Sequence, residues 1–315
     1  MSTANRTLIV PVDGSEHASA AARYASRLAT ALELPVVLVH AFPASATDLF
    51  EKLGAGTEGM TLSHLSGQGF ESIRKESADT AFQRAREHMG QGLKVEERLL
   101  TGEAREALPR FVNDQEAPHV VMGRRGLGVF REALLGSVSE RLIHEVAEPV
   151  TVVSSGQNRS AEVGPLVVPV DGSEFAATAV RYAGELAAAL GLDIHLLHAS
   201  PATAGEIPAL ESRLLDSSAA WPDEAALAEF GQQSGDNAFA VARDVIADTG
   251  AKGLYIKDVR RSGHPAQAVN DYLRELECGE IVIGRRGMGR IQTMLLGSVS
   301  QRVLRGATGP VTVIG

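Results

Sequence analysis

The sequence predicts an α/β protein with two tandem doubly wound domains, each a five-stranded parallel sheet with helices on both faces. Three observations carry this prediction. VPVDGSE at 10–16 returns at 168–174, so the chain repeats with a domain-sized period of about 160 residues. Apolar strand-like runs alternate with helix-like runs, as in parallel sheets with right-handed crossovers. Matching glycine frames, GRRGLGVFREALLGSVSER and GRRGMGRIQTMLLGSVSQR, follow an apolar run in each half.

The first copy can be divided into elements from its apolar patterning. Residues 7–12 form a continuous apolar run, typical of a strand buried on both faces. A stripe of apolar residues predicts a helix over 16–32, formed by Ala21, Tyr24, Ala25, Leu28 and Leu32. The segment 43–66 is rich in Gly, Ser and Thr and predicts an irregular excursion. The remaining elements are expected at 36–41, 94–100, 119–123 and 150–154 (strands) and at 69–89, 103–115 and 137–147 (helices).

Composition bounds the class of protein. With 315 residues, 44% of them hydrophobic, each half has enough apolar sequence for its own core, and we expect domains at 1–155 and 164–315. The chain has no apolar run of the roughly 18 residues that a membrane span needs, and strand-like sequence begins at Thr7, which argues against a signal peptide. A single cysteine, Cys278, allows no intrachain disulfide and favours a reducing cytoplasm. The net charge of −9 argues against nucleic acid as a partner.

Motif positions indicate where a ligand would bind. Asp13, Gly102 and Gly123 all lie just past predicted strand ends, and ligands of such sheets bind at those ends near the topological switch point. Asp13 and its copy Asp171 open a Gly-Ser turn. Each could cap a turn or helix, or could contact a ribose hydroxyl or a metal ion on phosphates.

The glycine frame favours a phosphate site. Gly123 and Gly126, with Gly128 beyond them, leave room for a phosphate near the backbone, although a tight strand–helix turn would also need glycine. Gly136 and Ser137 begin a helix with free N–H groups, and Ser139 adds a hydroxyl. The second copy offers Gly284, Gly287, Gly297, Ser298 and Ser300.

Side chains around the frame give weaker signals. The pairs Arg124–Arg125 and Arg285–Arg286 would screen phosphate charge, and at least one of each pair is expected to face solvent. His40 and His198 at apolar strand ends are expected to hydrogen-bond locally. No metal site is predicted. The sequence lacks a Walker A loop, a GxGxxG fingerprint and a GxSxG elbow, and no general base stands in the frame, so no catalytic residue is proposed.

The chain resembles the universal stress protein family. PVDGSE, the LVHA second strand, TGE at 101–103 and the two glycine frames carry this resemblance, which covers both halves. It implies ATP binding, with Mg or Mn on the phosphates. It also implies that the last strands at 150–153 and 311–314 pair within one chain, and it leaves a homodimer of such chains as an open alternative. By the same likeness, the first site would use Pro11, Val12, Asp13, Ala41, Met122, Gly123, Arg125, Gly126, Gly136, Ser137, Val138 and Ser139. The second would use Pro169, Val170, Asp171, Ala199, Ile283, Gly284, Arg286, Gly287, Gly297, Ser298, Val299 and Ser300.

The sequence therefore predicts an ATP-binding, cytoplasmic, nucleotide-dependent stress-response regulator with an unidentified protein partner. Nucleotide occupancy would order the segments 43–66 and 200–230. Two alternatives stay open: a slow metal-dependent ATPase and a scaffold that keeps the glycines for folding alone. Alanine at 41 and 199 leaves less adenine packing than the valine often found there. Glu103 and His264 differ between the copies, so the two sites are expected to differ in affinity.

Overall fold

The computed structural model describes residues 6–52, 67–126, 135–155, 164–200, 224–276, 279–287 and 296–315. The chain divides into two compact units, Met1–Asn158 and Arg159–Gly315. Cys278 and Gly128 lie outside the described residues, as do residues 53–66 of the segment 43–66 and residues 201–223 of the segment 200–230.

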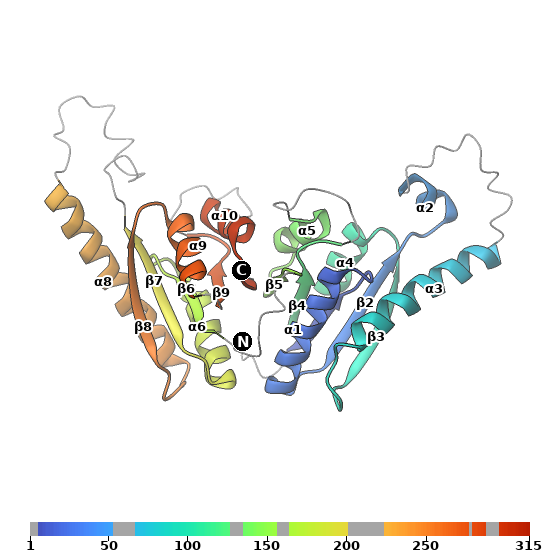
Figure 1. Cartoon of the computed structure of the whole chain (residues 1–315), viewed down its shortest axis with the longest axis horizontal. Helices are drawn as coiled ribbons and strands as arrows, with labels where there is room; N and C mark the ends of the chain where they lie inside the picture. Colours follow the sequence, from blue (N-terminus) through green and yellow to red (C-terminus); the bar gives the residue numbers. More distant parts are fainter. Residues whose placement is uncertain are drawn as a thin grey trace, which may run out of the picture. The chain divides into compact units, whose positions relative to one another are not determined.

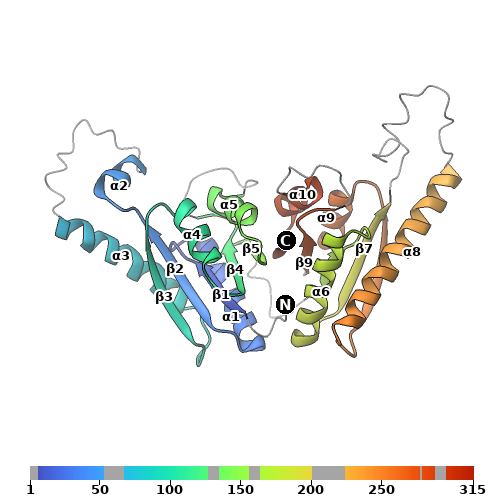
Figure 2. The same ribbon diagram turned by 180° about the vertical axis from the view of Figure 1, so that it is seen from behind.

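The first unit is a parallel sheet wrapped by helices (Figure 1). Its strands run in the order β3-β2-β1-β4-β5, and each neighbouring pair is parallel. Helices α1 and α3 pack on one face and α4 and α5 on the other (Figure 2). In chain order the elements are β1 (Thr7–Pro11), α1 (Glu16–Leu32), β2 (Val36–Phe42), α2 (Ala46–Lys52), α3 (Gly67–Arg86), β3 (Val95–Thr101), α4 (Ala104–Asn113), β4 (Pro118–Gly123), α5 (Ser137–Glu145) and β5 (Val150–Val153).

The second unit repeats this arrangement. Its strand order is β8-β7-β6-β9-β10, again with parallel neighbours, and α6 and α8 share one face while α9 and α10 share the other. The elements are β6 (Leu166–Pro169), α6 (Glu174–Leu190), β7 (Ile194–Ser200), α8 (Glu224–Asp248), β8 (Ile256–Ser262), α9 (Pro265–Leu276), β9 (Glu280–Gly284), α10 (Ser298–Gly306) and β10 (Val311–Ile314). The predicted fold class is thereby confirmed for both halves.

Local chemistry explains where the first helix of each unit begins and ends. The Ser15 hydroxyl accepts a hydrogen bond from the Ala18 N–H at 3.1 Å and caps α1, and Ser173 caps α6 in the same way. The α1 stripe predicted from apolar spacing is buried, apart from Leu32, which is half-buried. The end of α1 is marked by Glu33 in the left-handed region, a place taken in α6 by Gly191.

One helix differs from the sequence-based expectation. The segment 43–66, which we predicted to be irregular, contains helix α2. The Ser45 hydroxyl accepts from the Asp48 N–H at 3.2 Å and so starts a helix that apolar periodicity did not indicate. Strand β3 is exposed along most of its length, because it lies at the sheet edge rather than in its centre. Its charged residues suit an edge that must not recruit further strands.

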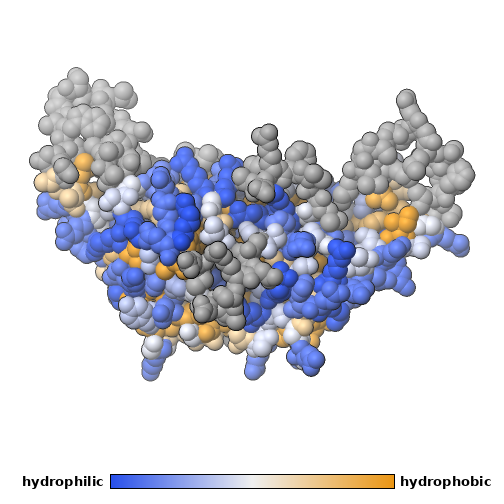
Figure 3. Space-filling model, in the orientation of Figure 1, coloured by the Kyte–Doolittle hydropathy of each residue, from blue (hydrophilic) through white to orange (hydrophobic). Residues whose placement is uncertain are grey.

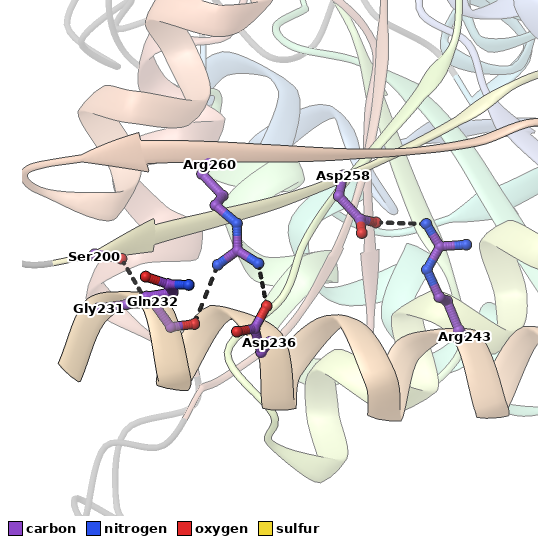
Figure 4. A network of polar contacts seen from close by, with 7 residues as sticks. All are labelled: Ser200, Gly231, Gln232, Asp236, Arg243, Asp258 and Arg260. Carbon is purple, nitrogen blue, oxygen red and sulfur yellow. Dashed lines mark hydrogen bonds and ion pairs between the residues drawn. The ribbon is translucent and has the colours of Figure 1, made fainter. Parts of the chain in front are cut away.

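Polar contacts hold α8 against β7 and β8 (Figure 4). The Ser200 hydroxyl donates to the Gly231 carbonyl at 3.2 Å, and Arg260 donates to the Gln232 carbonyl at 3.2 Å while pairing with Asp236. One further ion pair joins Arg243 to Asp258 at 2.9 Å. These contacts fix α8 to the end of β7 and to the middle of β8.

Hydrophilic residues predominate on the face drawn in Figure 3, with hydrophobic residues scattered between them. Among the described residues, no helix is long and apolar enough to cross a membrane. The large hydrophobic side chains that this part of the chain exposes are Ile73, Leu99, Phe230, Val241 and Tyr255.

Candidate functional site

The topological switch point of the first unit lies between β1 and β4, since the chain moves from β1 to one side of the sheet and later to the other. Asp13 follows β1 here, and its Oδ1 accepts a hydrogen bond from the Ser15 N–H at 3.0 Å. Gly126 lies directly beside the other carboxylate oxygen, because a Cβ on Gly126 would overlap Asp13 Oδ2. The turn and the glycine frame are thus brought together.

The second unit reproduces this junction. Asp171 Oδ1 accepts from the Ser173 N–H at 2.9 Å, and a Cβ on Gly287 would overlap Asp171 Oδ2. Serine, rather than aspartate, caps the helix in both units. One carboxylate oxygen therefore fixes the turn, and the other lies at the edge where a ligand would approach.

Gly123 and Gly284 have a packing role. A Cβ on Gly123 would lie 2.6 Å from the carbonyl carbon of His17, and one on Gly284 would lie 2.5 Å from the carbonyl oxygen of Phe175. The end of β4 or β9 thus touches the backbone of the first turn of α1 or α6. Glycine is needed here for close packing, whether or not a ligand is bound.

The residues that follow β4 are hydrogen-bonded to the start of α5. The Gly136 N–H donates to the Arg124 carbonyl at 2.9 Å, and the Gly297 N–H donates to that of Arg285 at 2.8 Å. No side chain caps α5 or α10, since each has glycine at its N-cap. Uncapped first-turn N–H groups and the helix dipole form an anion-binding end. Ser137 and Ser298 are exposed at this end, with Val138 and Val299 half-buried behind them.

Ser139 and Ser300 point the other way. Both are 3% exposed, and their hydroxyls donate to the carbonyls of Gly123 at 3.0 Å and Gly284 at 2.8 Å. These hydrogen bonds join each helix to the preceding strand, so the hydroxyl protons are not available to a ligand. What each residue offers to a ligand is its backbone N–H.

The arginines give the site a positive charge. Arg124 is buried, at 6% exposure, whereas Arg125 is half-buried. Burial lowers the pKa of the Arg124 guanidinium, and the neighbouring charge of Arg125 lowers it further. In the second unit, burial and then Arg286 lower the pKa of Arg285. Because the two positive charges of a pair repel each other, an anion bound beside them would stabilise both. Arg125, Arg285 and Arg286 are each half-buried, so the solvent-facing arginine expected in each pair stays a prediction.

His17 belongs to this cluster, although sequence reasoning missed it. The Ser155 N–H donates to His17 Nδ1 at 3.1 Å, which places the ring between α1 and the end of β5. Burial, followed by Arg125 and Arg124, lowers the pKa of His17. The signal in the sequence was its place in the first turn of the helix that starts at the switch point.

The other predicted residues line the strand ends. Val12 and Met122 are buried, as are Val170 and Ile283, so a ligand would meet their backbone rather than their side chains. Half-buried positions are held by Pro11, Ala41, Pro169 and Ala199. His40 Nδ1 donates to the Val12 carbonyl at 2.7 Å and His198 Nδ1 to that of Val170 at 2.8 Å, which confirms their local hydrogen bonding.

The units differ beside α4 and α9. Glu103 makes no side-chain cap for α4, whereas His264 Nδ1 accepts from the Ala266 N–H at 3.2 Å at the start of α9. Within the described residues, no group of three or more His, Cys, Asp or Glu side chains could hold a metal ion.

A family model described as "Universal stress protein family" matches residues 4–154 and again 163–315. The chain belongs to this family. It is similar to a universal stress protein of Mycobacterium tuberculosis (strain ATCC 25618 / H37Rv), at 30% identity over 99% of this chain and 98% of that one.

Two solved structures extend the comparison. A universal stress protein from Archaeoglobus fulgidus DSM 4304 superposes with a TM-score of 0.63 at 21% identity, covering 98% of this chain and 97% of its own, which supports the tandem fold. A universal stress protein solved in complex with cAMP matches at 25% identity and a TM-score of 0.35, over 48% of this chain and 97% of its own.

Proposed function

We propose that this universal stress protein binds ATP at each of its two switch points and acts as a nucleotide-dependent stress-response regulator. The observation that carries the proposal is the duplicated junction in which Asp13 meets Gly126 and Asp171 meets Gly287. Two copies of one carboxylate–glycine contact, each beside an uncapped helix start, support two sites of the same kind.

The charges of the site support a polyphosphate ligand. The backbone of Arg124 and Arg125 lies against Gly136, so a buried arginine and its half-buried neighbour come directly beside the helix start, where cations and helix N–H groups would both favour a phosphate. A ribose would meet the Asp13 carboxylate, and the phosphate chain would run towards Gly136 and Ser137. The adenine would lie against Ala41 at the end of β2. Divalent ions such as Mg or Mn would arrive with the phosphates.

The regulatory part of the proposal concerns segments next to these sites. ATP bound at the two sites is proposed to order the segments 43–66 and 200–230 and thereby change partner choice. Hydrogen exchange of the full chain with and without ATP tests this step. Unchanged exchange in both segments at saturating ATP would contradict it.

The binding test uses charge at an exposed position. Ser137→Glu with Ser298→Glu adds a carboxylate at each helix start, where a negative charge stabilises the helix but repels a phosphate. Two like charges about 4 Å apart near a protein surface repel by about 4 kcal/mol, so ATP affinity should fall at least a hundredfold. The neutral pair Ser137→Gln with Ser298→Gln is the matched control and should bind within a few-fold of the wild type.

Nucleotide released from the purified, denatured chain should be ATP, and calorimetry should give about two ATP per chain once the protein is stripped. The same ATP affinity for the Glu and Gln pairs would place the phosphates elsewhere. No bound nucleotide and no titratable ATP binding would favour the scaffold alternative.

A further inference from the structure

The turn that follows β1 is covered by the end of helix α3. Gly14 lies in this turn between Asp13 and Ser15, with a φ of +80°. A Cβ placed on Gly14 would lie 3.8 Å from the Cδ and Nη1 atoms of Arg84 and 4.0 Å from the Cα of Ala81. The Arg84 guanidinium donates through Nη1 to the Gly14 carbonyl at 2.5 Å. A side chain of α3 therefore holds the turn that carries Asp13.

The second unit has valine at the corresponding place. Phe82 of α3 and Phe239 of α8 each pack edge-on against the histidine of the second strand of their unit, with ring centres 6.3 and 6.2 Å apart. Two positions beyond these phenylalanines stand Arg84 and Val241. Val241 is 44% exposed, and its side chain has no hydrogen-bond donor. Apart from its chain neighbours, no described residue has an atom within 4 Å of a Cβ placed on Gly172. The matching turn of the second unit thus lacks the arginine contact.

This difference falls on the part of the site that orients a carboxylate. One oxygen of Asp13 accepts from the Ser15 N–H and the other lies against Gly126, so the direction of the carboxylate depends on the conformation of the turn. Glycine adopts positive and negative φ about equally readily, so Gly14 does not fix that conformation by itself. A hydrogen bond from a charged donor such as Arg84 restricts it more strongly than a neutral one would.

We propose that Arg84 is a positioning residue of the first nucleotide site: it fixes the turn that carries Asp13 before the ligand binds, whereas the second site orders its turn only on binding. The inference rests on the proposed ATP site. A site that is already held in its binding conformation loses less conformational entropy when the ligand arrives. Arg84 acts through the turn and its carboxylate, so its effect should appear in contacts to the ribose and not in contacts to the phosphates.

Hydrogen exchange of the unliganded protein, followed by NMR, measures the contact directly. The Ser15 N–H is protected by the turn aspartate only while the turn is formed, so Arg84→Val should speed its exchange by about threefold to tenfold. The reciprocal variant Val241→Arg should slow exchange of the Ser173 N–H, which has the same partner in the second unit. Arg86→Val is the matched control. It removes a positive charge from the same helix end, where the arginine pairs with a glutamate of β3, and should leave both amides unchanged.

Calorimetry then tests the effect on binding, one site at a time. With the second site blocked by Ser298→Glu, Arg84→Val should weaken ATP binding by about threefold to tenfold. Inorganic tripolyphosphate has no ribose to meet Asp13, so its affinity should stay within about twofold. With the first site blocked by Ser137→Glu, Val241→Arg should strengthen ATP binding at the second site.

The outcomes separate the inference from the proposed function. Unchanged ATP affinity in Arg84→Val, with two ATP bound to the wild type, would overturn the inference alone. An equal loss for ATP and tripolyphosphate would also overturn it, because the charge of Arg84 would then act on the phosphates. Absence of ATP binding to the wild type would overturn both. If Arg84→Val does not fold, Val241→Arg at its exposed position decides, and unchanged exchange of the Ser173 N–H would contradict the proposal.

Discussion

Substitution of Gly123 by alanine tests whether the glycine frame is required for packing or only for a ligand. The added Cβ would lie 2.6, 2.7 and 2.8 Å from the carbonyl carbon, carbonyl oxygen and Cβ of His17. Ordinary contacts between such atoms are about 3.5–4.0 Å, so β4 or α1 must move by close to 1 Å. Overpacking of this kind costs about 1–3 kcal/mol. For a unit of about 150 residues, each kcal/mol lowers the melting temperature by about 2–4 °C.

Differential scanning calorimetry of the full chain without nucleotide measures this effect. Gly284→Ala should behave alike, since its Cβ would lie 2.5 Å from the carbonyl oxygen of Phe175. Gly67→Ala at the start of α3 is the matched control, because no atom of the residues that the structure describes lies within 4 Å of the added Cβ. If Gly123→Ala melts within about 1 °C of the control, the strand–helix contact does not require glycine and the packing argument is refuted.

Three further predictions concern stability. Burial lowers the pKa of His119 to about 3, so the folded state stays unprotonated where the unfolded chain binds a proton. Stability should therefore fall by about 1.4 kcal/mol per pH unit below about pH 6.5, and urea titrations of His119→Gln should lack this slope. Arg6→Ala breaks the ion pair of an arginine that is only 7% exposed, and should lower the free energy of unfolding, measured by urea titration, by about 2–3 kcal/mol. Arg86→Ala breaks a surface ion pair and should cost less than about 1 kcal/mol, so equal costs for the two variants would contradict the burial argument. Ser139→Ala removes a buried hydrogen bond and should cost about 1–2 kcal/mol, whereas Ser137→Ala should leave the melting temperature unchanged; a loss in both would be inconsistent with their opposite orientations.

Much of the fold could be predicted because the same pattern of strands, helices and glycine motifs occurs twice in the sequence. The helix predicted at 16–32 has those bounds in the structure, since a serine cap and an apolar stripe mark it locally. Local signals failed at α2. Its sequence has no strong apolar stripe, and a single capping contact from Ser45 starts it.

Site residues were predictable as positions but not as orientations. Spacing placed Ser137 and Ser139 at a helix start, yet it could not show that one hydroxyl is exposed and the other donates to Gly123. Which side a hydroxyl faces depends on how the helix docks against β4, and no local pattern encodes that. His17 escaped notice for a related reason, because its partner Ser155 is distant in sequence and appears beside it only in the folded unit.

The contact between frame and helix also explains how the copies could diverge in one place and not in others. Gly123 and Gly284 meet the carbonyl groups of His17 and Phe175, atoms that every residue possesses. The junction therefore requires glycine on the strand, while the side chain on the helix stays free to change. Asp13 and Asp171 lack this freedom, because their carboxylate oxygens both fix the turn and meet Gly126 or Gly287. A duplicated site built in this way keeps its backbone frame, while the side chain beyond Cβ at this helix position differs between the two copies.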